Sequence, residues 1–573
     1  MASLQQYSWL IAIISIAFCF SAFGNGANDV ANAYATSVAA RTLNMWQAGI
    51  LSIFTEFVGA VALGSGVTAT IKNKIMDLDR FRNKPGTLVL AMTCAEIGSA
   101  SWLMIANLVG FPVSTTHTIV GALVGSGIAS QASISWGWTS GSVSQIAASW
   151  AIAPLISASM AAILFLVLKF SVLERQDPFK WAIRLIPFYL AFTGGILALF
   201  IVVELPTAPS LEEFGASNVI AIVLGTFGGV LIISYIFFLP YFHRRLVLND
   251  ARVQVWHLPL GPLLWRDDPP LYWPGNNGNP NGAVTKDHYR NTRLEDMTPV
   301  DSPTRSLGDE ETKSTTNSAE VPAAADSSAL ERGQANMTSK LRKRHVEPRE
   351  RFLAPTKDLP LYIPARLWAW TKYLLLQGVT RDVTSHDSQH LEKTHARAKQ
   401  YDNKVEHLWT YAQVTSAMMM SIAHGSNDVA NAVGPWVAAY STYQAGKVES
   451  SSSTPIWILV VAGFLLGFGF WVLGWRIVAS LGNKITQMSP TRGYAIELGA
   501  AITVLLASRL GLPVSTTHCL TGATVGVGLM NFTLEATNWR QLLWIFAGWV
   551  LTLPVAGLIS GLLTVMALNT PHF

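Results

Sequence analysis

Cysteine and charged residues are scarce in this 573-residue chain. None of the three cysteines has the spacing of a metal site or of a disulfide framework, and we interpret them as small core residues: Cys19, Cys94 and Cys519. Asp, Glu, Lys and Arg make up only 13% of the residues, whereas 50% are apolar and the mean hydropathy is +0.34. A composition this poor in charge excludes a soluble domain of this size.

Lys and Arg are absent before the first apolar run, and no separate small-residue cleavage site follows it. Because a secretory signal peptide needs both features, we predict a retained membrane span. Crossing a bilayer takes ~20 residues. Apolar runs of suitable length lie near residues 7–23, 46–68, 87–110, 143–170, 181–203, 217–241, 408–440, 455–480, 492–510 and 540–568. The chain is therefore predicted to be an all-α, polytopic membrane protein embedded in a lipid bilayer.

A hydrophilic segment, residues 242–405, separates two membrane parts, residues 1–241 and 406–573. Its charged, Ser, Thr, Pro and Asn residues cannot bury enough apolar surface to offset the entropy of the chain, so a largely disordered cytoplasmic loop is predicted. An amphipathic helix on the membrane surface is predicted over 361–379. The net charge of +5 does not indicate a nucleic-acid partner, because the basic residues concentrate beside membrane segments, where they set orientation.

The two membrane parts carry matching motifs. GNGANDVANAYATSVAA at 24–40 corresponds to AHGSNDVANAVGPWVAA at 423–439, and FPVSTTHTIVGALVGSG at 111–127 corresponds to LPVSTTHCLTGATVGVG at 512–528. Two motifs in one order at nearly one offset indicate an internal duplication. Repeat 1 is predicted over about 7–133 and repeat 2 over about 408–533, with additional helices over 143–241 and a last helix over 540–568.

The number of spans before the loop determines how the second repeat enters the membrane. When 116–133 is counted as a crossing, this number is odd, and the second repeat then enters from the opposite side. We therefore predict about 12 transmembrane segments in two inverted-topology repeats with broken or re-entrant helices, and a substrate site near the midplane.

Both copies of PVSTTH place hydroxyl groups inside apolar regions. Proline interrupts an entering helix, and Ser and Thr are favoured N-cap residues, so each motif predicts a helix that begins inside the membrane. Glycines four apart behind each motif predict close packing on a neighbouring helix. A helix N-terminus with hydroxyl donors attracts an anion. The predicted binding residues for a tetrahedral oxyanion are Ser114, Thr115, Thr116, Ser515, Thr516 and Thr517. The alternative is that these hydroxyls bond to helix carbonyls, which two matched copies make less favourable.

Neither PVSTTH copy contains Lys or Arg, so a buried phosphate would need accompanying cations. The second repeated motif offers oxygen ligands at helical spacing, which suit Na⁺, or a proton held by the aspartate. The predicted coupling-ion residues are Asn28, Asp29, Asn427 and Asp428, followed one turn later by Asn32 and Asn431. We also expect the nearby glycines to free backbone carbonyls at a helix break. The alternative role for either aspartate is an N-cap or a structural hydrogen bond.

Further ionisable residues lie in apolar runs. Glu56, Glu96 and Glu497 are each compatible with a cation ligand, a proton relay or a group that pairs two helices. His117 and His518 follow the hydroxyl triplets. They either act on phosphate, with a protonation that responds near neutral pH, or hold the helix break through local hydrogen bonds.

With GANDVANAYATSVAART, GSNDVANAVGPWVAA and two copies of PVSTTH, the chain resembles the inorganic phosphate transporter (PiT) family. The layout with a long central hydrophilic loop resembles fungal plasma-membrane members. The resemblance implies a twelve-span carrier that moves inorganic phosphate with Na⁺, or in some members H⁺, by alternating access, often as a homodimer. Carried over to this sequence, it implies phosphate binding by the two hydroxyl triplets, cation binding by Asn28, Asp29, Asn427 and Asp428, and a need for Glu56 and Glu497 in transport.

The predicted function is therefore import of inorganic phosphate by a Na⁺-coupled symporter in the plasma membrane, with the termini extracellular and no organic cofactor. The alternatives are an H⁺-coupled symporter and a phosphate sensor that signals through the loop without net transport. An enzyme such as a membrane phosphatase is not favoured, because no positioned acid completes the Ser or Thr and His pairs.

Overall fold

This computed structural model describes residues 4–204, 215–275, 278–280, 282–290, 345–385, 388–449 and 453–570. Every secondary-structure element of more than one residue pair in these ranges is a helix. An isolated bridge between Met76 and Ile134 is the single β pairing in these ranges. The N-terminal membrane part contains α1 (Ser8–Asn25), α2 (Ala31–Ala39), α3 (Met45–Leu63), α4 (Ser65–Asn73), α5 (Pro85–Val109), α6 (Thr115–Ala129), α7 (Val143–Leu168), α8 (Pro178–Glu204), α10 (Ala216–Ile233) and α11 (Leu239–Phe242). The rest contains α14 (Pro348–Phe352), α15 (Pro364–Leu376), α16 (Gln389–Ala396), α17 (Asn403–Ala445), α18 (Ile456–Leu473), α19 (Trp475–Leu481), α20 (Pro490–Arg509), α21 (Thr516–Leu529) and α22 (Trp539–Leu568).

Eight helical segments within these ranges are long and apolar enough to cross a membrane: Leu4–Ala39, Met45–Leu63, Pro85–Val109, Val143–Leu173, Pro178–Val203, Ala216–Val247, Ile456–Leu473 and Trp539–Leu568. Helix α17 is more polar, but its 43 residues extend about 64 Å at the usual rise per residue. The fold is thus an all-α bundle of a multi-pass membrane protein, as predicted. The count of about 12 segments and the inverted relation of the repeats stay predictions.

Large apolar side chains cover the outside of the bundle. On α7, α10 and α22 the exposed residues include Leu155, Leu224 and Leu562, which are 68%, 63% and 66% exposed. Exposing such a surface to water is unfavourable, whereas exposing it to lipid acyl chains is not. These helices therefore present their outer faces to the membrane.

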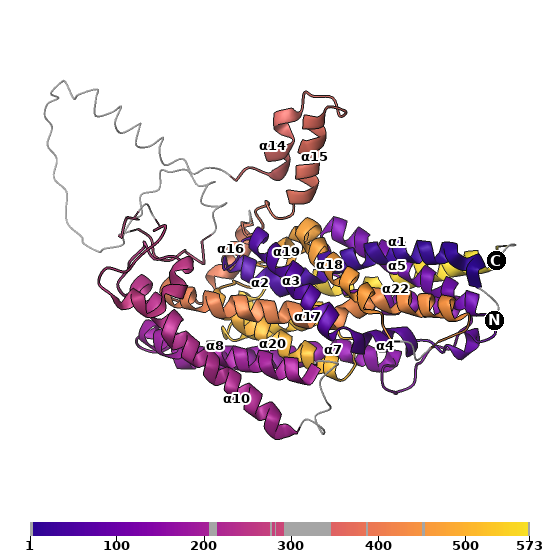
Figure 1. The fold of residues 1–573 in the computed structure, drawn as a ribbon, viewed down its shortest axis with the longest axis horizontal. Coiled ribbons are helices and arrows are strands. Elements are labelled where there is room, and N and C mark those ends of the chain that lie inside the picture. Colours follow the sequence, from indigo (N-terminus) through magenta and orange to yellow (C-terminus); the bar gives the residue numbers. More distant parts are fainter. Residues whose placement is uncertain are drawn as a thin grey trace, which may run out of the picture.

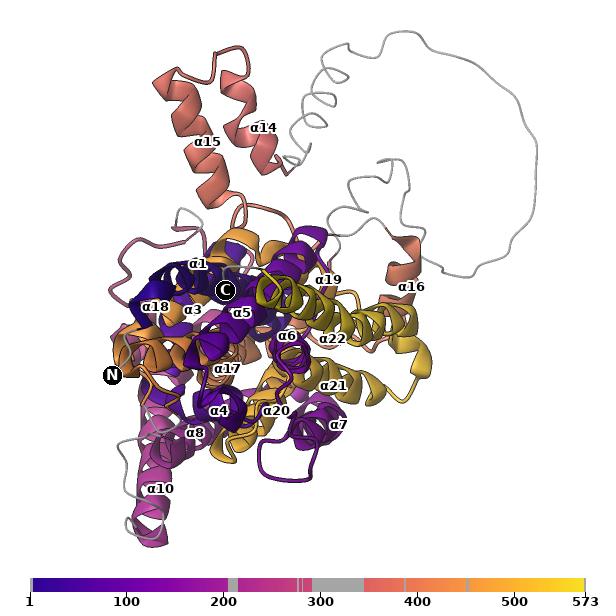
Figure 2. The ribbon, with the colours of Figure 1, turned by 90° about the vertical axis from the view of Figure 1, so that its right-hand side faces the viewer.

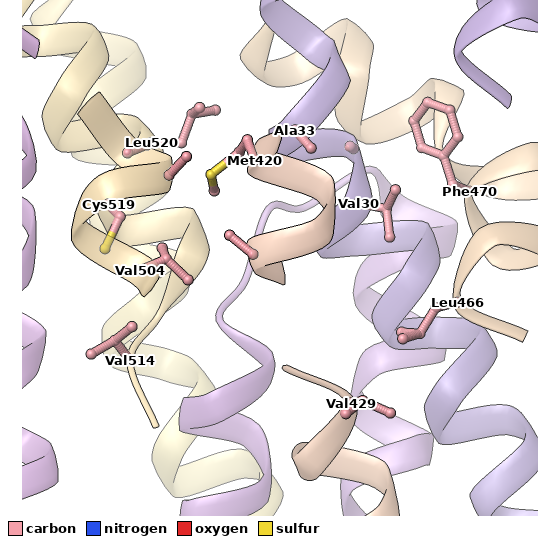
Figure 3. Close-up of a cluster of buried hydrophobic side chains, with 14 of the residues drawn as sticks. Val30, Ala33, Met420, Val429, Leu466, Phe470, Val504, Val514, Cys519 and Leu520 are labelled. Carbon is pink, nitrogen blue, oxygen red and sulfur yellow. The ribbon is translucent and has the colours of Figure 1, made fainter. Parts of the chain in front are cut away.

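Helix α17 passes through the middle of the bundle and contacts α3, α4, α5 and α20 (Figure 1). Its buried Met420 and Val429 belong to the apolar cluster of Figure 3, together with Val30 and with Leu466 of α18. Chain segments that are hundreds of residues apart thereby share one core, which surrounds the polar residues at the bundle centre.

The glycines behind the two PVSTTH motifs lie at tight helix crossings, as predicted. A Cβ on Gly125 of α6 would collide with the carbonyl oxygen of Gly557 in α22, and one on Gly526 of α21 would collide with that of Ala158 in α7. Each short helix thus packs against the long helix that follows the other copy of the motif. Figure 2, a view along the bundle, shows α6 beside α22 and α21 beside α7.

The expected helix break at the glycines of the other motif pair is absent at Gly425, whereas at Gly26 a π-helical turn interrupts the α-helix. Helix α17 runs without interruption through Gly425, while Gly26 begins a five-residue π-helical turn, Gly26–Val30, between α1 and α2. A Cβ on Gly26 would collide with Leu466 O, and one on Gly425 would lie 2.7 Å from Glu56 O. These glycines instead allow α18 and α3 to approach the aspartate-bearing helices closely.

The ends of the hydrophilic segment contain regular structure, and α15 (Pro364–Leu376) lies within the range 361–379 predicted to be helical. Its central part, 291–344, lies outside the described residues. Before that gap, His257 is buried in the 3₁₀ helix Val255–Trp265. His288 is buried against the bundle, where its Nδ1 is 2.8 Å from Ala40 O, and the Tyr289 hydroxyl donates to Glu406 at 2.6 Å. Bonds to the ends of membrane helices therefore order residues whose composition indicates disorder.

Both termini lie at the same end of the bundle, and the hydrophilic segment leaves near the other end (Figure 1). This arrangement is compatible with the predicted orientation, which places the termini outside the cell and the loop inside. The orientation itself stays a prediction.

Candidate functional site

Two short helices begin at the centre of the bundle, and a serine caps each one. Ser114 and Ser515 have extended backbone, and their Oγ atoms accept hydrogen bonds from the backbone N–H groups of His117 and His518 at 3.2 and 3.3 Å. Both are the N-caps that the sequence predicts. In the first turn of α6, Thr115 N also donates to Asp29 Oδ2 at 3.4 Å.

The two helix tips meet although they are about four hundred residues apart. Thr116 Oγ1 donates to Val514 O at 3.1 Å, and Thr517 Oγ1 donates to Val113 O at 3.2 Å. All six predicted hydroxyl residues are at most 1% exposed. The tertiary structure thus brings both triplets into one buried cluster.

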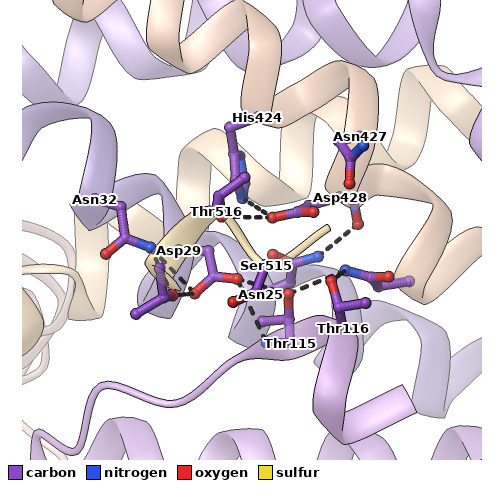
Figure 4. Close-up of polar contacts among 12 residues, drawn as sticks. Asn25, Asp29, Asn32, Thr115, Thr116, His424, Asn427, Asp428, Ser515 and Thr516 are labelled. Atoms are coloured by element: carbon purple, nitrogen blue, oxygen red, sulfur yellow. Dashed lines mark hydrogen bonds and ion pairs between the residues drawn. The ribbon is translucent and has the colours of Figure 1, made fainter. Parts of the chain in front are cut away.

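Two aspartates face these tips (Figure 4). Asp29 accepts hydrogen bonds from Thr115 Oγ1 at 2.6 Å and from Thr517 Oγ1 at 2.8 Å, so it contacts both tips. Asp428 accepts from Thr516 Oγ1 at 2.7 Å. One oxygen of each carboxylate lies within 4.8 Å of the other and of a His424 ring nitrogen. The predicted ion-binding aspartates are therefore close neighbours and not two remote sites.

Asn28 and Asn427 bind the loops in front of the tips. Asn28 Oδ1 accepts from Val113 N at 3.1 Å, and its Nδ2 donates to Asn107 Oδ1 at 2.8 Å and to Phe111 O at 3.2 Å. Asn427 makes the matching set of bonds, with Val514 N at 3.3 Å, Ser508 Oγ at 3.0 Å and Leu512 O at 3.1 Å. These bonds engage both ends of each amide and attach the segments before the tips to the aspartate-bearing helices.

Asn32 and Asn431, one turn further on, do reach the threonines. Asn32 Nδ2 donates to Thr517 Oγ1 at 2.8 Å, and Asn431 Nδ2 donates to Thr115 Oγ1 at 3.0 Å. The Oδ1 atoms of Asn32 and Asn431 are buried without a hydrogen-bond partner, as are Asp428 Oδ1 and Asn25 Oδ1. A buried polar atom without a partner is costly, so these oxygens suit a bound cation.

Asn25 is a site residue that sequence reasoning missed. Its Nδ2 donates to the backbone oxygen of Asp428 at 2.8 Å, which joins the two motifs directly. The available signal was its position four residues before Asp29, which matches the position of His424 before Asp428. On a helix that spacing places both side chains on one face.

His424 links Asp428 to Glu56 of α3. Its Nδ1 lies 2.7 Å from Glu56 Oε2, and its Nε2 lies 3.2 Å from Asp428 Oδ2. Glu56 Oε1 also accepts from Ser421 Oγ at 2.5 Å. All of these side chains are fully buried, and an imidazolium here would offset one of the two adjacent carboxylate charges.

Glu497 of α20 lies outside this cluster. Its carboxylate accepts hydrogen bonds from Thr36 and Ser37 of α2 at 2.5 and 2.6 Å, and from Ser416 and Gln413 of α17 at 2.7 and 3.3 Å. Thr36 and Ser37 follow Asp29 by about two helical turns, which corresponds to roughly 10–12 Å along the axis. Glu497 thus joins α20 to α2 and α17.

Glu96, the counterpart of Glu497, is fully buried beside the Ser21 hydroxyl of α1. The positions that match Thr36 and Ser37 are Pro435 and Trp436, which offer no side-chain hydroxyl. The two glutamates therefore have different surroundings in spite of their matching positions.

His117 and His518 form a symmetric ring cluster. Their ring centroids are 4.6 Å apart, and each ring stacks on a tryptophan, His117 on Trp150 at 3.9 Å and His518 on Trp549 at 3.8 Å. His117 Nδ1 lies 3.4 Å from Trp549 O, and His518 Nδ1 lies 3.1 Å from Trp150 O. These contacts attach both tips to α7 and α22 and are compatible with the local role of the histidines.

Comparison with known proteins agrees with this geometry. The model of the phosphate transporter family (PHO4) matches residues 25–560, a range that holds both motif pairs. The chain belongs to the phosphate transporter family. It is 36% identical to the phosphate-repressible phosphate permease pho-4 of Neurospora crassa, over 100% of this chain and 99% of the permease. It is 28% identical to sodium-dependent phosphate transporter 2 of Xenopus laevis, over 97% of each chain.

A solved structure, titled the sodium-dependent phosphate transporter, shares the fold. The TM-score is 0.63 at 24% identity, over 98% of this chain and 100% of that one. The relatives are named as transporters or permeases and not as enzymes. The resemblance inferred from the two motif pairs is thereby confirmed at the level of family and fold.

Proposed function

We propose that this protein imports inorganic phosphate together with Na⁺ by alternating access in the plasma membrane. The observation that supports this function best is the meeting of two hydroxyl-bearing helix tips around two neighbouring buried carboxylates. Within the described residues, no Lys or Arg is a hydrogen-bond partner of Asp29, Asp428 or the four threonines. An anion in this place needs mobile cations for neutralisation.

The hydrogen bonds favour an order of binding. Thr115, Thr516 and Thr517 now donate their hydroxyl hydrogens to carboxylates. A phosphate oxygen needs the same hydrogens, and two ionised aspartates would repel it. Na⁺ ions bound at Asp29 and Asp428 would replace those donors and remove the repulsion, so that the threonines can turn toward phosphate. We infer that cations bind before phosphate.

Residue roles follow from these contacts. The phosphate ligands are Ser114, Thr115, Thr116, Ser515, Thr516 and Thr517. Asp29 and Asp428 hold the cations, with Asn25, Asn32 and Asn431 as additional oxygen ligands. Asn28 and Asn427 keep the tips in place. A homodimer with a cytoplasmic hydrophilic segment and extracellular termini completes the proposal.

Uptake of labelled phosphate into proteoliposomes tests the proposal. An inward Na⁺ gradient at equal pH should drive accumulation, whereas a pH gradient without Na⁺ should not. Thr115→Val and Thr516→Val should each lower the uptake rate about tenfold, since each removes a ligand of phosphate and a partner of an aspartate. Thr118→Val is the matched control, because Thr118 Oγ1 donates only to Ser114 O within its own helix. Wild-type uptake in both test variants would refute the assignment.

H⁺ is the second candidate for the coupling ion, and one contact favours it. His424 lies between Asp428 and Glu56, and such a group can carry a proton in place of a metal ion. Accumulation driven by the pH gradient alone would establish this alternative. A sensor without transport would accumulate phosphate under neither gradient.

A further inference from the structure

Helix α15 stands apart from the bundle. It runs across the direction of the long helices and projects sideways with α14 (Figures 1 and 2). Its C-terminal end is fixed to two membrane helices. Trp471 Nε1 of α18 donates to Leu375 O at 2.7 Å, Gly378 packs against the backbone of Trp471, and Val379 packs against Gly49 of α3.

One side of α15 is covered by protein. Ala369 is 6% exposed, and Arg366 Nη1 donates to Leu353 O at 2.8 Å and to Thr356 Oγ1 at 3.1 Å, which attaches α15 to the segment after α14. Trp370 lies on this side as well, in a pocket that it shares with Glu347 and Arg349.

The opposite side is apolar and open. Leu367, Trp368, Leu374 and Leu375, which we call the open face of α15, are 62%, 59%, 53% and 44% exposed. Helical spacing places them together around Thr371. In Figure 1, α14 lies toward the end from which the hydrophilic segment leaves, so the side of α15 that is turned toward the other end is uncovered.

The attachment point gives the level of α15 in the membrane. Helix α18 ends at Leu473 and α3 begins at Met45, so the contacts of Gly378 and Val379 lie where two membrane helices end. Immediately inside that level, α3 exposes Trp46, Ile50 and Phe54 to lipid. The open face of α15 therefore continues the lipid-facing surface of the bundle.

We propose that α15 lies in the bilayer interface on the side of the hydrophilic segment, with its open face among the lipid acyl chains. Trp368 and Lys372 fit this level, since the Lys372 ammonium lies 5.4 Å from the Trp368 ring while the lysine can extend to the headgroups. Arg351 and Lys357, on α14 and in the turn after it, are exposed on the other side, as expected for the aqueous side. The proposed partner of this surface is thus lipid. The helices to which α15 is attached are α3, which carries Glu56, and α18, which packs against α17.

Spin labelling of the full chain in proteoliposomes tests the proposal. Cys19→Ala provides the background, because Cys19 is exposed while Cys94 and Cys519 are buried. Nitroxides at Leu367→Cys and Leu374→Cys should collide with oxygen several-fold more often than with a water-soluble nickel chelate. A nitroxide at Arg351→Cys on α14 should show the reverse preference, and it serves as the matched control.

The other outcomes are also informative. A preference for the nickel chelate at both test positions would place the open face in water and overturn the proposal. Low collision rates with both reagents would show that protein covers the face, and short dipolar distances between labels at 367 would identify that protein as a second copy. Monodisperse elution of each labelled variant, equal to that of the background protein, establishes that it is folded. Because two separate positions are labelled, failure of one variant to fold leaves the proposal testable.

Discussion

The two halves of the central site share their hydroxyl and carboxylate groups but differ behind the carboxylates. Asp29 follows Asn25 by one turn, whereas Asp428 follows His424. The backbone oxygen that Gly26 approaches belongs to Leu466, whereas the one that Gly425 approaches belongs to Glu56. An amide and a leucine beside Asp29 thus correspond to an imidazole and a second carboxylate beside Asp428.

This difference teaches which features of a duplicated site can vary. Side-chain hydrogen bonds of the tips connect the two halves of the chain: Thr517 donates to Asp29, and Asn431 donates to Thr115. A change in one of these groups would disturb both repeats. His424 contacts Asp428 on one side and Glu56 on the other, and neither His424 nor Glu56 bonds to a tip, so charges could be acquired behind Asp428 without moving the tips.

Removal of either central charge should have the largest effect. Asp29→Asn and Asp428→Asn should each lower Na⁺-driven phosphate uptake by at least about tenfold, because a loss of roughly 1.4 kcal/mol in cation binding already gives that factor. Folding should be little changed, since Asn keeps one acceptor oxygen and its amide N–H can donate to the other threonine hydroxyl. Uptake assays with Asp79→Asn as control check this, because Asp79 is exposed in an ion pair with Arg82. Wild-type ion dependence in both test variants would refute it.

Conversion of the second half to the chemistry of the first is a sharper test of the comparison. Glu56→Leu alone leaves the buried His424 Nδ1 without its carboxylate and should destabilise the protein by about 3–5 kcal/mol. Adding His424→Asn recreates the Asn25 and Leu466 pair and should restore part of this loss. Thermal unfolding of the two single variants and the double variant gives the coupling energy. Additive effects would show that the His424 and Glu56 contact does not distinguish the halves.

The two tight helix crossings should respond alike to substitution, in contrast to the different surroundings of the two aspartates. Gly125→Ala forces α6 away from Gly557, and Gly526→Ala forces α21 away from Ala158, so each should cost about 1–3 kcal/mol of stability. Gly228→Ala in α10 is the control, since a Cβ there meets nothing within 4 Å. Unequal losses in unfolding experiments would show that only one crossing is tight.

The smallest effect should come from protonation of His288, which contacts the end of α2. Helix α2 ends at Ala39, and His288 Nδ1 donates to the next carbonyl, whereas α17 continues to Ala445 in the second half. Burial lowers the pKa of His288 below its ordinary value. As the pH falls below about 6.5, His288 therefore binds a proton when its segment is undocked but not yet when it is docked. Docking of this segment on the end of α2 then weakens by up to about 1.4 kcal/mol for each further decrease of one pH unit.

Limited proteolysis within 282–290 measures this docking. Cleavage should become faster between pH 7.5 and pH 5.5, and His288→Gln should remove that dependence while keeping a hydrogen-bond donor. A wild-type protein with equal cleavage rates at both pH values would contradict the prediction.

Several features of the site were predictable because they depend on residues close in sequence. The caps of α6 and α21 follow from Pro, Ser and Thr in PVSTTH, and the tight crossings follow from glycines four apart. Local backbone preferences determine these features.

Other features were not predictable because they depend on which helix becomes a neighbour. Helical spacing places Asn28 beside Asp29, yet the amide binds Val113 and Phe111 and not the aspartate cluster. The motif glycines were expected to break a helix, but the backbones of α3 and α18 occupy the space above them. Glu497 and Glu96 have matching positions, yet Glu497 accepts hydrogen bonds from α2 and α17, whereas both oxygens of Glu96 are buried without a hydrogen-bond partner among the described residues.

The sequence by itself determined the membrane-spanning character of the chain, the duplication and the starts of the two central helices, because apolar length, repeated motifs and capping residues act locally. Only the tertiary structure decided that the two tips meet each other and that His424 joins Asp428 to Glu56. Those contacts arise from the packing of helices about four hundred residues apart, where close approach of backbones selects the partners.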